Sequence, residues 1–466
     1  MEWCNRVIYN IDKYGFMRRK IYDQLLDWKE NRSHKEALLI DGARRVGKSW
    51  IVEEFARREY ESYILIDFSQ ASKTILDLFQ TYRGRWNDFF LHLQLETGVK
   101  LNPGRSLIVF DEIQKFPQAR EAIKYLVQDG RYSYIETGSL MSINENVKDI
   151  NIPSEEHRLN MFPMDLEEFL WALGDDMMMD YVKDCFNRRQ PLGQSLHRKM
   201  MDYLRLYMIV GGMPQAVAEW VESKDFDRVD ITKRNILSLY RNDIRKYAHG
   251  QEAKVTKIFD TIPSQLQRHE KKFKLSSLGK GTRGRNVDTA FFWLDESRVV
   301  NTCFAATEPT VGLEMKLDES SRKLYMADTG LLISHAFSEV AIKADELYRK
   351  LMHDKLDVNK GMLVENLVAQ MLRTAGHKLY FFSSYSKTEA RERMEVDFLI
   401  PKPTIGSRHN IHPIEVKSST RYTLTSLSKF VGKYRNAAAE PMVLHTSDVK
   451  VEDGVIYLPL YMGGLL

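Results

Sequence analysis

Cysteine is scarce in this sequence, and its spacing excludes two kinds of site. The 466 residues include three cysteines, Cys4, Cys185 and Cys303, which lie far apart. An odd number at such distances provides neither a disulfide framework nor zinc-ligand spacing, and it fits a reducing compartment. Long apolar runs are also missing. No stretch approaches the roughly 20 apolar residues that cross a bilayer, and residues 1–20 carry charges throughout, unlike a signal peptide. We therefore expect a cytoplasmic protein with no membrane contact.

A strong excess of one charge is absent as well. The formal net charge is +4, with 28% charged and 43% hydrophobic residues, which is the composition of a soluble globular protein. Such a small net charge permits contact with nucleic acid without indicating it. The sequence contains no repeat and no low-complexity segment. A chain of this length exceeds one ordinary core, so we expect roughly two to four domains.

Short apolar runs alternate with helical patterns in the first part of the chain. The predicted strands are residues 37–41, 63–67, 106–110 and 132–135, and helices are expected at residues 17–36 and 50–60. This alternation predicts a parallel sheet covered on both faces. We therefore expect an α/β domain in residues 17–165. The pattern is helical from residue 169 to about residue 260, and residues 290–294 predict a strand.

A phosphate-binding loop follows the first predicted strand. Residues 42–49 fit the pattern G-x-x-x-x-G-K-[ST] with no mismatch and lie between a strand and a helix. Glycines in such a loop let backbone N–H groups approach phosphate oxygens, while Lys48 would reach the β- and γ-phosphates and Ser49 would hold Mg²⁺. The sequence thus predicts a site for ATP and Mg²⁺. The candidate cofactor-binding residues are Gly42, Ala43, Arg44, Arg45, Val46, Gly47, Lys48, Ser49 and Trp50.

Polar residues at the ends of later strands complete the predicted site. Asp111 would support Mg²⁺, and Glu112 would polarise the attacking water. Thr137, at the end of the next strand, could sense the γ-phosphate or that water, with a simple turn as the alternative. Arg158 could stabilise the transferring phosphate, within the chain or across a subunit boundary. A surface ion pair is the alternative for Arg158.

The order of motifs along the chain resembles an AAA-type ATPase of the bacterial and archaeal group that carries a C-terminal domain of unknown function. The matching segments are residues 42–49, 110–114, 137–139, 162–164 with 168–170, 211–214, 243–244, 323–332, and 395–398 with 414–417. The family pattern usually has Gly before the Arg that Arg158 matches, where this chain has His157. The resemblance implies four parts: an AAA core (17–165), a helical lid (166–260), a winged-helix-like segment (261–335) and a restriction-endonuclease-like domain (336–466).

Three carboxylates and a lysine form a second candidate site in the last part of the chain. The predicted elements there are a helix at residues 361–375 and strands at residues 378–383, 395–400 and 413–417. Because side chains alternate across a strand, Glu415 and Lys417 share one face. Asp397 and Glu415 could bind a divalent metal, with Glu365 as a further ligand and Lys417 orienting a water. This set is the PD-(D/E)XK nuclease constellation, and domains with it also serve as DNA-binding or structural modules.

Basic residues cluster between Lys271 and Arg285, and they could contact DNA phosphates. A solvated charged face is the alternative. Our hypothesis from the sequence is an ATPase coupled to a nuclease-like domain that acts on or senses DNA, and it is compatible with a homo-oligomer. The alternative is a nucleotide-dependent switch or scaffold whose C-terminal domain binds DNA or a protein partner without cleaving.

Overall fold

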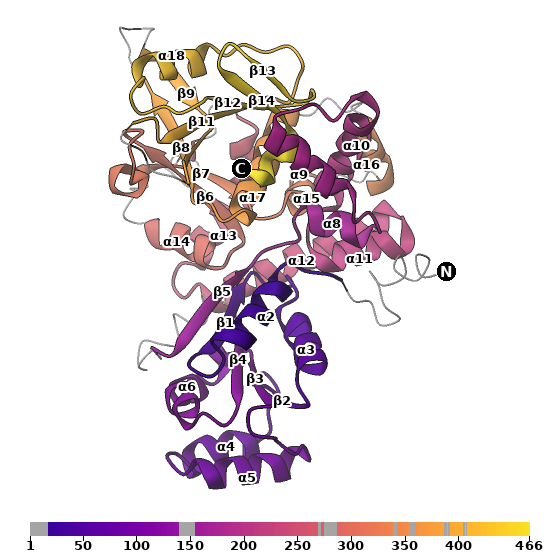
Figure 1. Ribbon diagram of the computed structural model, residues 1–466, viewed down its shortest axis with the longest axis vertical. Helices are drawn as coiled ribbons and strands as arrows, with labels where there is room; N and C mark the ends of the chain where they lie inside the picture. The colour runs from indigo at the N-terminus through magenta and orange to yellow at the C-terminus, as the bar shows by residue number, and fades with distance from the viewer. Residues whose placement is uncertain are drawn as a thin grey trace. The chain divides into compact units, whose positions relative to one another are not determined.

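The computed structural model describes residues 17–138, 154–268, 272–274, 287–338, 343–353, 359–385, 389, 392–403, 406 and 408–466. The chain divides into two compact units, Arg18–Phe162 and a second that contains Pro163–Leu466. Figure 1 follows the chain through both units from indigo to yellow. Among the described residues, no helix combines the length and the apolar composition needed to span a membrane.

The first unit is built on a parallel sheet, as predicted, but the sheet has five strands where four were predicted. Its strands are β1 (Ala37–Gly42), β2 (Ser62–Asp67), β3 (Ser106–Asp111), β4 (Ser133–Gly138) and β5 (Glu156–Met161), in the order β2-β3-β4-β1-β5. Every neighbouring pair is parallel. All six residues of β1 and of β3 are buried, which explains their unbroken apolar runs. The polar edge strand β5 was not predicted, because only Met161 of its residues is buried.

Helices join the strands of this sheet. They are α2 (Ile21–Asn31), α3 (Lys48–Glu59), α4 (Lys73–Thr81), α5 (Trp86–Thr97) and α6 (Pro117–Asp129), with a 3₁₀ turn η1 (Ile113–Lys115). Local signals set their ends. Helix α6 begins with Pro117, whose fixed φ suits the first helical turn, and ends at Gly130 with φ 74°. In the core, Phe79 meets Phe68 and Phe110 edge to face, and Phe68 and Phe110 are tilted against each other.

The second unit begins with a run of helices, again as predicted. They are α8 (Leu166–Ala172), α9 (Met178–Arg188), α10 (Gln194–Val210), α11 (Pro214–Ser223), α12 (Phe226–Tyr247), α13 (Glu252–Leu266) and α14 (Asp288–Glu296). Asp165 and Glu168 form a capping box that starts α8. The strand predicted at residues 290–294 is wrong, because these residues lie in α14. Its buried residues Ala290, Phe291 and Leu294 follow helical spacing, while Phe292 is 63% exposed.

Two sheets form the rest of the second unit. The first contains β6 (Val300–Ala306), β7 (Leu317–Met326), β8 (Leu379–Ser384) and β9 (Met394–Val396) in the order β7-β6-β8-β9. The second contains β10 (Phe398–Pro401), β11 (Ile411–Val416), β12 (Met442–His445), β13 (Lys450–Glu452) and β14 (Val455–Pro459) in the order β10-β11-β12-β14-β13. The remaining elements are η4 (Leu313–Lys316), α15 (Thr329–Ala336), α16 (Ala344–Met352), α17 (Lys360–Thr374), α18 (Thr425–Lys433) and η6 (Leu460–Leu465).

The first of these sheets crosses the boundary that the sequence placed at residues 335 and 336. Strand β6 pairs in parallel with β8, with Cys303 opposite Leu379. The two strands of residues 261–335 therefore belong to the same sheet as β8 and β9. They do not form a separate winged-helix wing of their own among the described residues.

Two glycine-containing motifs meet in the second unit. Asp328 accepts a 2.5 Å hydrogen bond from the backbone N–H of Gly212 and caps α15 by accepting from Leu331 at 2.8 Å. Gly330 packs so closely on the end of α10 that a Cβ there would lie 2.6 Å from the carbonyl oxygen of Val210. Glycine is required at this position because the two backbones touch.

Candidate functional site

The predicted phosphate loop connects β1 to α3. At Gly42 a Cβ would lie 2.3 Å from the carbonyl oxygen of Met161, so only glycine fits beside strand β5. Gly47 has φ 97° and Arg45 φ 71°, which turn the loop back on itself. Helix α3 then begins at Lys48 with no acidic residue in its first turn. The backbone N–H groups of this turn, with the positive end of the helix dipole, suit an anion.

Lys48 lies inside this loop. Its Nζ donates hydrogen bonds to the carbonyl oxygens of Gly42 (2.9 Å) and Ala43 (3.1 Å). Burial lowers the pKa of Lys48, and the carboxylates of Glu112, Asp41 and Asp111 act in the opposite direction. A phosphate oxygen carries more charge than a carbonyl and would be a stronger acceptor for the same ammonium.

One oxygen of Asp111 accepts hydrogen bonds from two other predicted site residues. Ser49 Oγ donates to Asp111 Oδ1 at 2.9 Å, and the hydroxyl of the buried Thr137 donates to the same oxygen. Asp111 ends β3 and Thr137 lies near the end of β4, and the two strands are parallel neighbours. A carboxylate and a hydroxyl are oxygen ligands of the kind that Mg²⁺ takes beside nucleotide phosphates. These residues therefore fit Mg²⁺.

Glu112 directly follows this carboxylate in an unusual backbone conformation. Its φ and ψ are 54° and 42°, in the left-handed region that costs energy for a residue with a Cβ. The side-chain amide of Gln114 donates to Glu112 Oε2 and holds the carboxylate. Glu112 therefore lies at the same edge of the sheet as Asp111.

The other predicted loop residues differ in exposure. Val46 is buried, whereas Arg44 and Arg45 are exposed. Trp50 lies in the first turn of α3 with 37% of its surface exposed.

Arg158 is not brought to the phosphate loop of its own chain. It lies in β5 opposite Leu39, three residues before Met161, which pairs with Gly42. At ~3.3 Å per residue, this places Arg158 about 10 Å back along the strand from the loop. Its Nη2 lies 4.0 Å from Glu156 Oε1, and its side chain is 40% exposed on an edge strand.

A buried ionic triad beneath the site was not predicted. Arg120 of α6 makes a bidentate pair with Glu156 at 3.0 and 3.1 Å, and its Nε lies 3.8 Å from Glu136. Glu136 has no exposed surface and precedes Thr137 in β4. Burial, and secondly the charge of Glu156, raises the pKa of Glu136 well above 4.5. A single charged residue inside the run Tyr134-Ile135-Glu136-Thr137 is the signal that could have revealed it.

The second predicted site is assembled in part. Asp397 separates β9 from β10, and its Oδ2 accepts from the backbone N–H of Val416 at 2.9 Å. Lys417 Nζ donates to Glu415 Oε2 at 3.0 Å, as their shared strand face predicted. Burial and the neighbouring Asp397 raise the pKa of Glu415 to about 9.

Glu365 has other partners. Lys323 of β7 lies 3.3 Å from Glu365 Oε1, and the hydroxyl of Tyr325 donates to the same oxygen. Lys323 also lies 2.8 Å from Glu395. Burial alone would lower the pKa of Lys323, but Glu365, Glu395 and Asp397 together raise it well above its usual value.

This geometry does not fit the predicted three-carboxylate metal site. Within the described part of the chain, no group of three or more His, Cys, Asp or Glu side chains is placed to hold a metal ion. Glu365 is instead engaged by an ammonium and a hydroxyl. The sequence indicated no role for Lys323 beyond its place in the matching segment of residues 323–332. A lysine in the apolar run Lys323-Leu324-Tyr325-Met326, at the end of a strand, was the signal.

Most of the basic segment between Lys271 and Arg285 lies outside the described residues. Of its part that the structure describes, Lys272 lies with its ammonium 5.9 Å from the ring centroid of Phe381, and Phe273 is buried. The predicted DNA contact therefore falls mostly on residues outside the described part of the chain.

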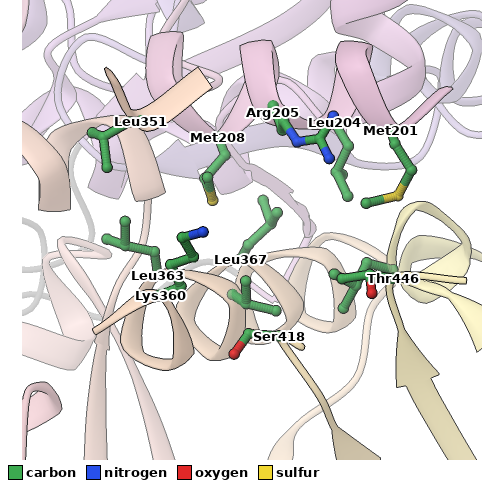
Figure 2. A pocket seen from close by; sticks show the side chains of 12 residues that line it. Met201, Leu204, Arg205, Met208, Leu351, Lys360, Leu363, Leu367, Ser418 and Thr446 are labelled. Carbon is green, nitrogen blue, oxygen red and sulfur yellow. The ribbon is translucent and has the colours of Figure 1, made fainter. Parts of the chain in front are cut away.

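A separate pocket with a volume of about 60 Å³ lies in the second unit. Figure 2 shows Leu204 and Met208 of α10 facing Leu363 and Leu367 of α17 across it. Lys360 and other polar groups reach its edge, but its lining is mainly apolar. It contains none of the candidate site residues.

Three segments of the chain match known family models. Residues 34–170 match a family described as an AAA domain. Residues 201–340 match a domain of unknown function, DUF8612, and residues 360–462 match another, DUF4143. No curated protein matches the chain. The AAA match and the parallel sheet with its phosphate loop together support an AAA-type domain in the first unit.

Solved structures similar to the chain are distant. Cdc6p from Pyrobaculum aerophilum is 12% identical, with 76% of this chain and 98% of that chain covered and a TM-score of 0.27. The S. cerevisiae Hsp104–ADP complex is 12% identical, with 79% of this chain covered and a TM-score of 0.27. This chain spans 45% of the Hsp104 chain. At these TM-scores neither likeness establishes a shared fold for the whole chain.

Proposed function

We propose that this protein binds ATP with Mg²⁺ at the loop of the first unit and hydrolyses it. The observation that carries the proposal is the meeting of the Ser49 and Thr137 hydroxyls on one oxygen of Asp111. A loop residue, a strand-end carboxylate and a neighbouring strand-end hydroxyl converge at the carboxyl edge of the parallel sheet. Nucleotides bind at this edge in open α/β folds.

Each residue has a role that its position supports. The loop N–H groups and Lys48 bind and orient the phosphates. Ser49 and Asp111 would hold Mg²⁺, which supplies charge neutralisation of the phosphates when bound. Glu112 orients the attacking water and accepts its proton, and Thr137 keeps Asp111 in place while facing the same edge.

We further propose that the second unit is the effector of this ATPase. The contact between Lys417 and Glu415, with Asp397 beside them, supports the nuclease-like arrangement suggested by the sequence. The pairing of Glu365 with Lys323 and Tyr325 supports the alternative, a domain that binds DNA or a protein partner without cleaving. We favour the alternative because Glu365, the predicted further ligand, is paired with Lys323 and Tyr325 and does not join Asp397 and Glu415 in a metal site.

The position of Arg158 bears on the oligomeric state. Its position on an exposed edge strand, away from its own loop, supports a role across a subunit boundary in a homo-oligomer.

ATP turnover tests the proposal directly. Phosphate release is measured with Mg²⁺, with and without single- and double-stranded DNA, for wild type and Lys48→Ala. We expect turnover in wild type that Lys48→Ala abolishes, and DNA stimulation would identify DNA as the partner. Absence of nucleotide binding by wild type would refute the proposal. Plasmid cleavage with Mg²⁺ or Mn²⁺ by wild type, lost in Lys417→Ala, would restore the nuclease form of the effector.

A further inference from the structure

Lys323 is the centre of a buried cluster in the second unit. Its side chain has no exposed surface, and its Nζ lies 2.8 Å from Glu395 Oε1 and 3.3 Å from Glu365 Oε1. Tyr325, two residues along β7, donates to the same oxygen of Glu365. The side of β7 that carries Lys323 and Tyr325 therefore supplies two donors to one carboxylate oxygen.

The other two predicted ligands are engaged in the same way. Asp397 accepts from the backbone N–H of Val416, and Glu415 accepts from the ammonium of Lys417. A hard divalent cation needs several oxygen atoms directed at one point. Here Glu365 is turned to Lys323 and Tyr325, whereas Glu415 makes a side-chain hydrogen bond with Asp397 and accepts from Lys417, so among the described residues the three carboxylates do not converge on one point.

Two segments with separate family matches build this cluster. Lys323 and Tyr325 lie in the segment of residues 201–340, whereas the carboxylates lie in residues 360–462. Strand β7 reaches them because β6, its neighbour, pairs with β8. The carboxylate cluster is therefore incomplete without β7.

We infer that the Lys323 ammonium neutralises the Glu365 carboxylate, as a divalent metal does in a metal-dependent nuclease. A lysine therefore holds this cluster together, and the cluster functions without a resident metal. A carboxylate buried at Glu365 needs a positive partner, and Lys323 provides a permanent one. The inference goes beyond ATP hydrolysis and assigns the second unit to binding rather than to cleavage.

Manganese titration and thermal unfolding of the full chain test this inference. Every protein carries Ser49→Ala and is free of nucleotide, so that the loop contributes no metal binding. The parent, Lys323→Met and the double variant Lys323→Met/Glu365→Gln are compared by calorimetric Mn²⁺ titration and by melting followed with circular dichroism. Lys254→Met, at an exposed lysine of the same unit, is the matched control.

The expected results differ between the proteins. The parent takes up no Mn²⁺ in the second unit, and its melting temperature does not respond to Mn²⁺. Lys323→Met melts about 5–15 °C lower, because breaking a buried pair leaves an uncompensated charge, and Mn²⁺ recovers part of this loss. The double variant recovers stability without Mn²⁺, since both charges are gone. Lys254→Met behaves as the parent.

Two results would overturn the inference. One is Mn²⁺ binding by the parent that disappears in Asp397→Asn. The other is a Lys323→Met protein that has the melting temperature of the parent and whose melting temperature does not change with Mn²⁺. If Lys323→Met does not fold, the parent titration and the double variant still decide. ATP hydrolysis is not read in these measurements, so their failure leaves the proposed ATPase standing.

Discussion

The Ser49 hydroxyl donates a 2.9 Å hydrogen bond to Oδ1 of Asp111, across 62 residues of sequence. Strands β1 and β3 are not neighbours in the sheet, because β4 lies between them. Thr137 at the end of β4 donates to the same oxygen and fills the gap between the loop and Asp111. The contact thus fixes the relative position of the loop and the strand-end carboxylates, which is the arrangement that a nucleotide site needs.

Lys48→Ala tests the loop. Removal of the ammonium should lower ATP turnover by about 10²-fold or more, because a preorganised cation that stabilises developing phosphate charge is lost. Nucleotide affinity, followed with a fluorescent ATP analogue, should fall as well. Lys100→Ala removes an exposed lysine of the same unit and should change neither quantity. Wild-type turnover by Lys48→Ala would remove the loop from the mechanism.

Glu112→Gln separates binding from chemistry. The amide keeps the shape of the side chain but cannot accept the proton of the attacking water, so turnover should fall by about 10²–10⁴-fold. ATP affinity should stay close to that of wild type, because Lys48, Ser49 and Asp111 are unchanged. Equilibrium nucleotide binding and single-turnover phosphate release measure the two effects. Normal turnover would show that Glu112 is a structural residue of the strand end.

Arg158 can be tested by mixing inactive proteins. If Arg158 acts across a subunit boundary, Arg158→Ala should lose about 10³-fold in turnover or more. Its mixture with Lys48→Ala should recover activity, because Arg158→Ala subunits with an intact loop then receive Arg158 from a neighbour. A mixture of Lys48→Ala with Glu112→Gln is the control and should stay inactive, since no subunit has both groups. No recovery in the first mixture would contradict action across subunits.

The first unit was largely predictable from the sequence. Buried parallel strands such as β1 and β3 are continuous apolar runs, and the loop pattern fixes where phosphate-binding groups must lie. The sequence also located the carboxylates at the edge of the sheet. Strand β5 was not predicted, because an edge strand composed mainly of Glu, His, Arg and Asn has no apolar run.

The second site was predictable in composition but not in its partners. Alternation along β11 correctly placed Glu415 beside Lys417. Which cation reaches Glu365 depends on β7 pairing with β6 and β6 with β8, which are contacts between segments far apart in the chain. The strand predicted at residues 290–294, which lie in helix α14, was wrong for another reason. A short aromatic run has no periodicity that distinguishes a strand from a helix.

Gly330→Ala tests the junction of the two glycine motifs. The new Cβ would lie 2.6 Å from backbone atoms of Val210 and Gly211, and neither can move as a flexible side chain would. We expect a loss of about 2–4 kcal/mol in the free energy of unfolding, in the range of severe core strain. Gly432→Ala in α18 is the matched control, because nothing lies within 4 Å of its Cβ. That variant should be neutral or stabilised by up to about 1 kcal/mol, and equal effects of the two changes would contradict the packing argument.

The triad of Arg120, Glu136 and Glu156 predicts a dependence of stability on pH. One guanidinium faces two buried carboxyl groups, and Glu156 takes the bidentate pair. Glu136 therefore keeps its proton above the pH at which it would lose it in the unfolded chain, as its raised pKa indicates. The folded state binds this proton more tightly, so its contribution is complete below pH 4.5 and is lost as pH rises through the folded pKa.

Glu136→Gln measures that contribution, because glutamine copies the neutral acid at every pH. The difference in unfolding free energy between wild type and Glu136→Gln should shift against wild type as pH rises, by at most about 1.4 kcal/mol per pH unit. Urea unfolding of both proteins at several pH values between 5 and 8 provides the difference, and it cancels the titration of groups that they share. A constant difference would mean that Glu136 is ionised in the fold and that Arg120 serves both carboxylates. The slope of this difference between pH 5 and 8 therefore decides how the charge of Arg120 is balanced.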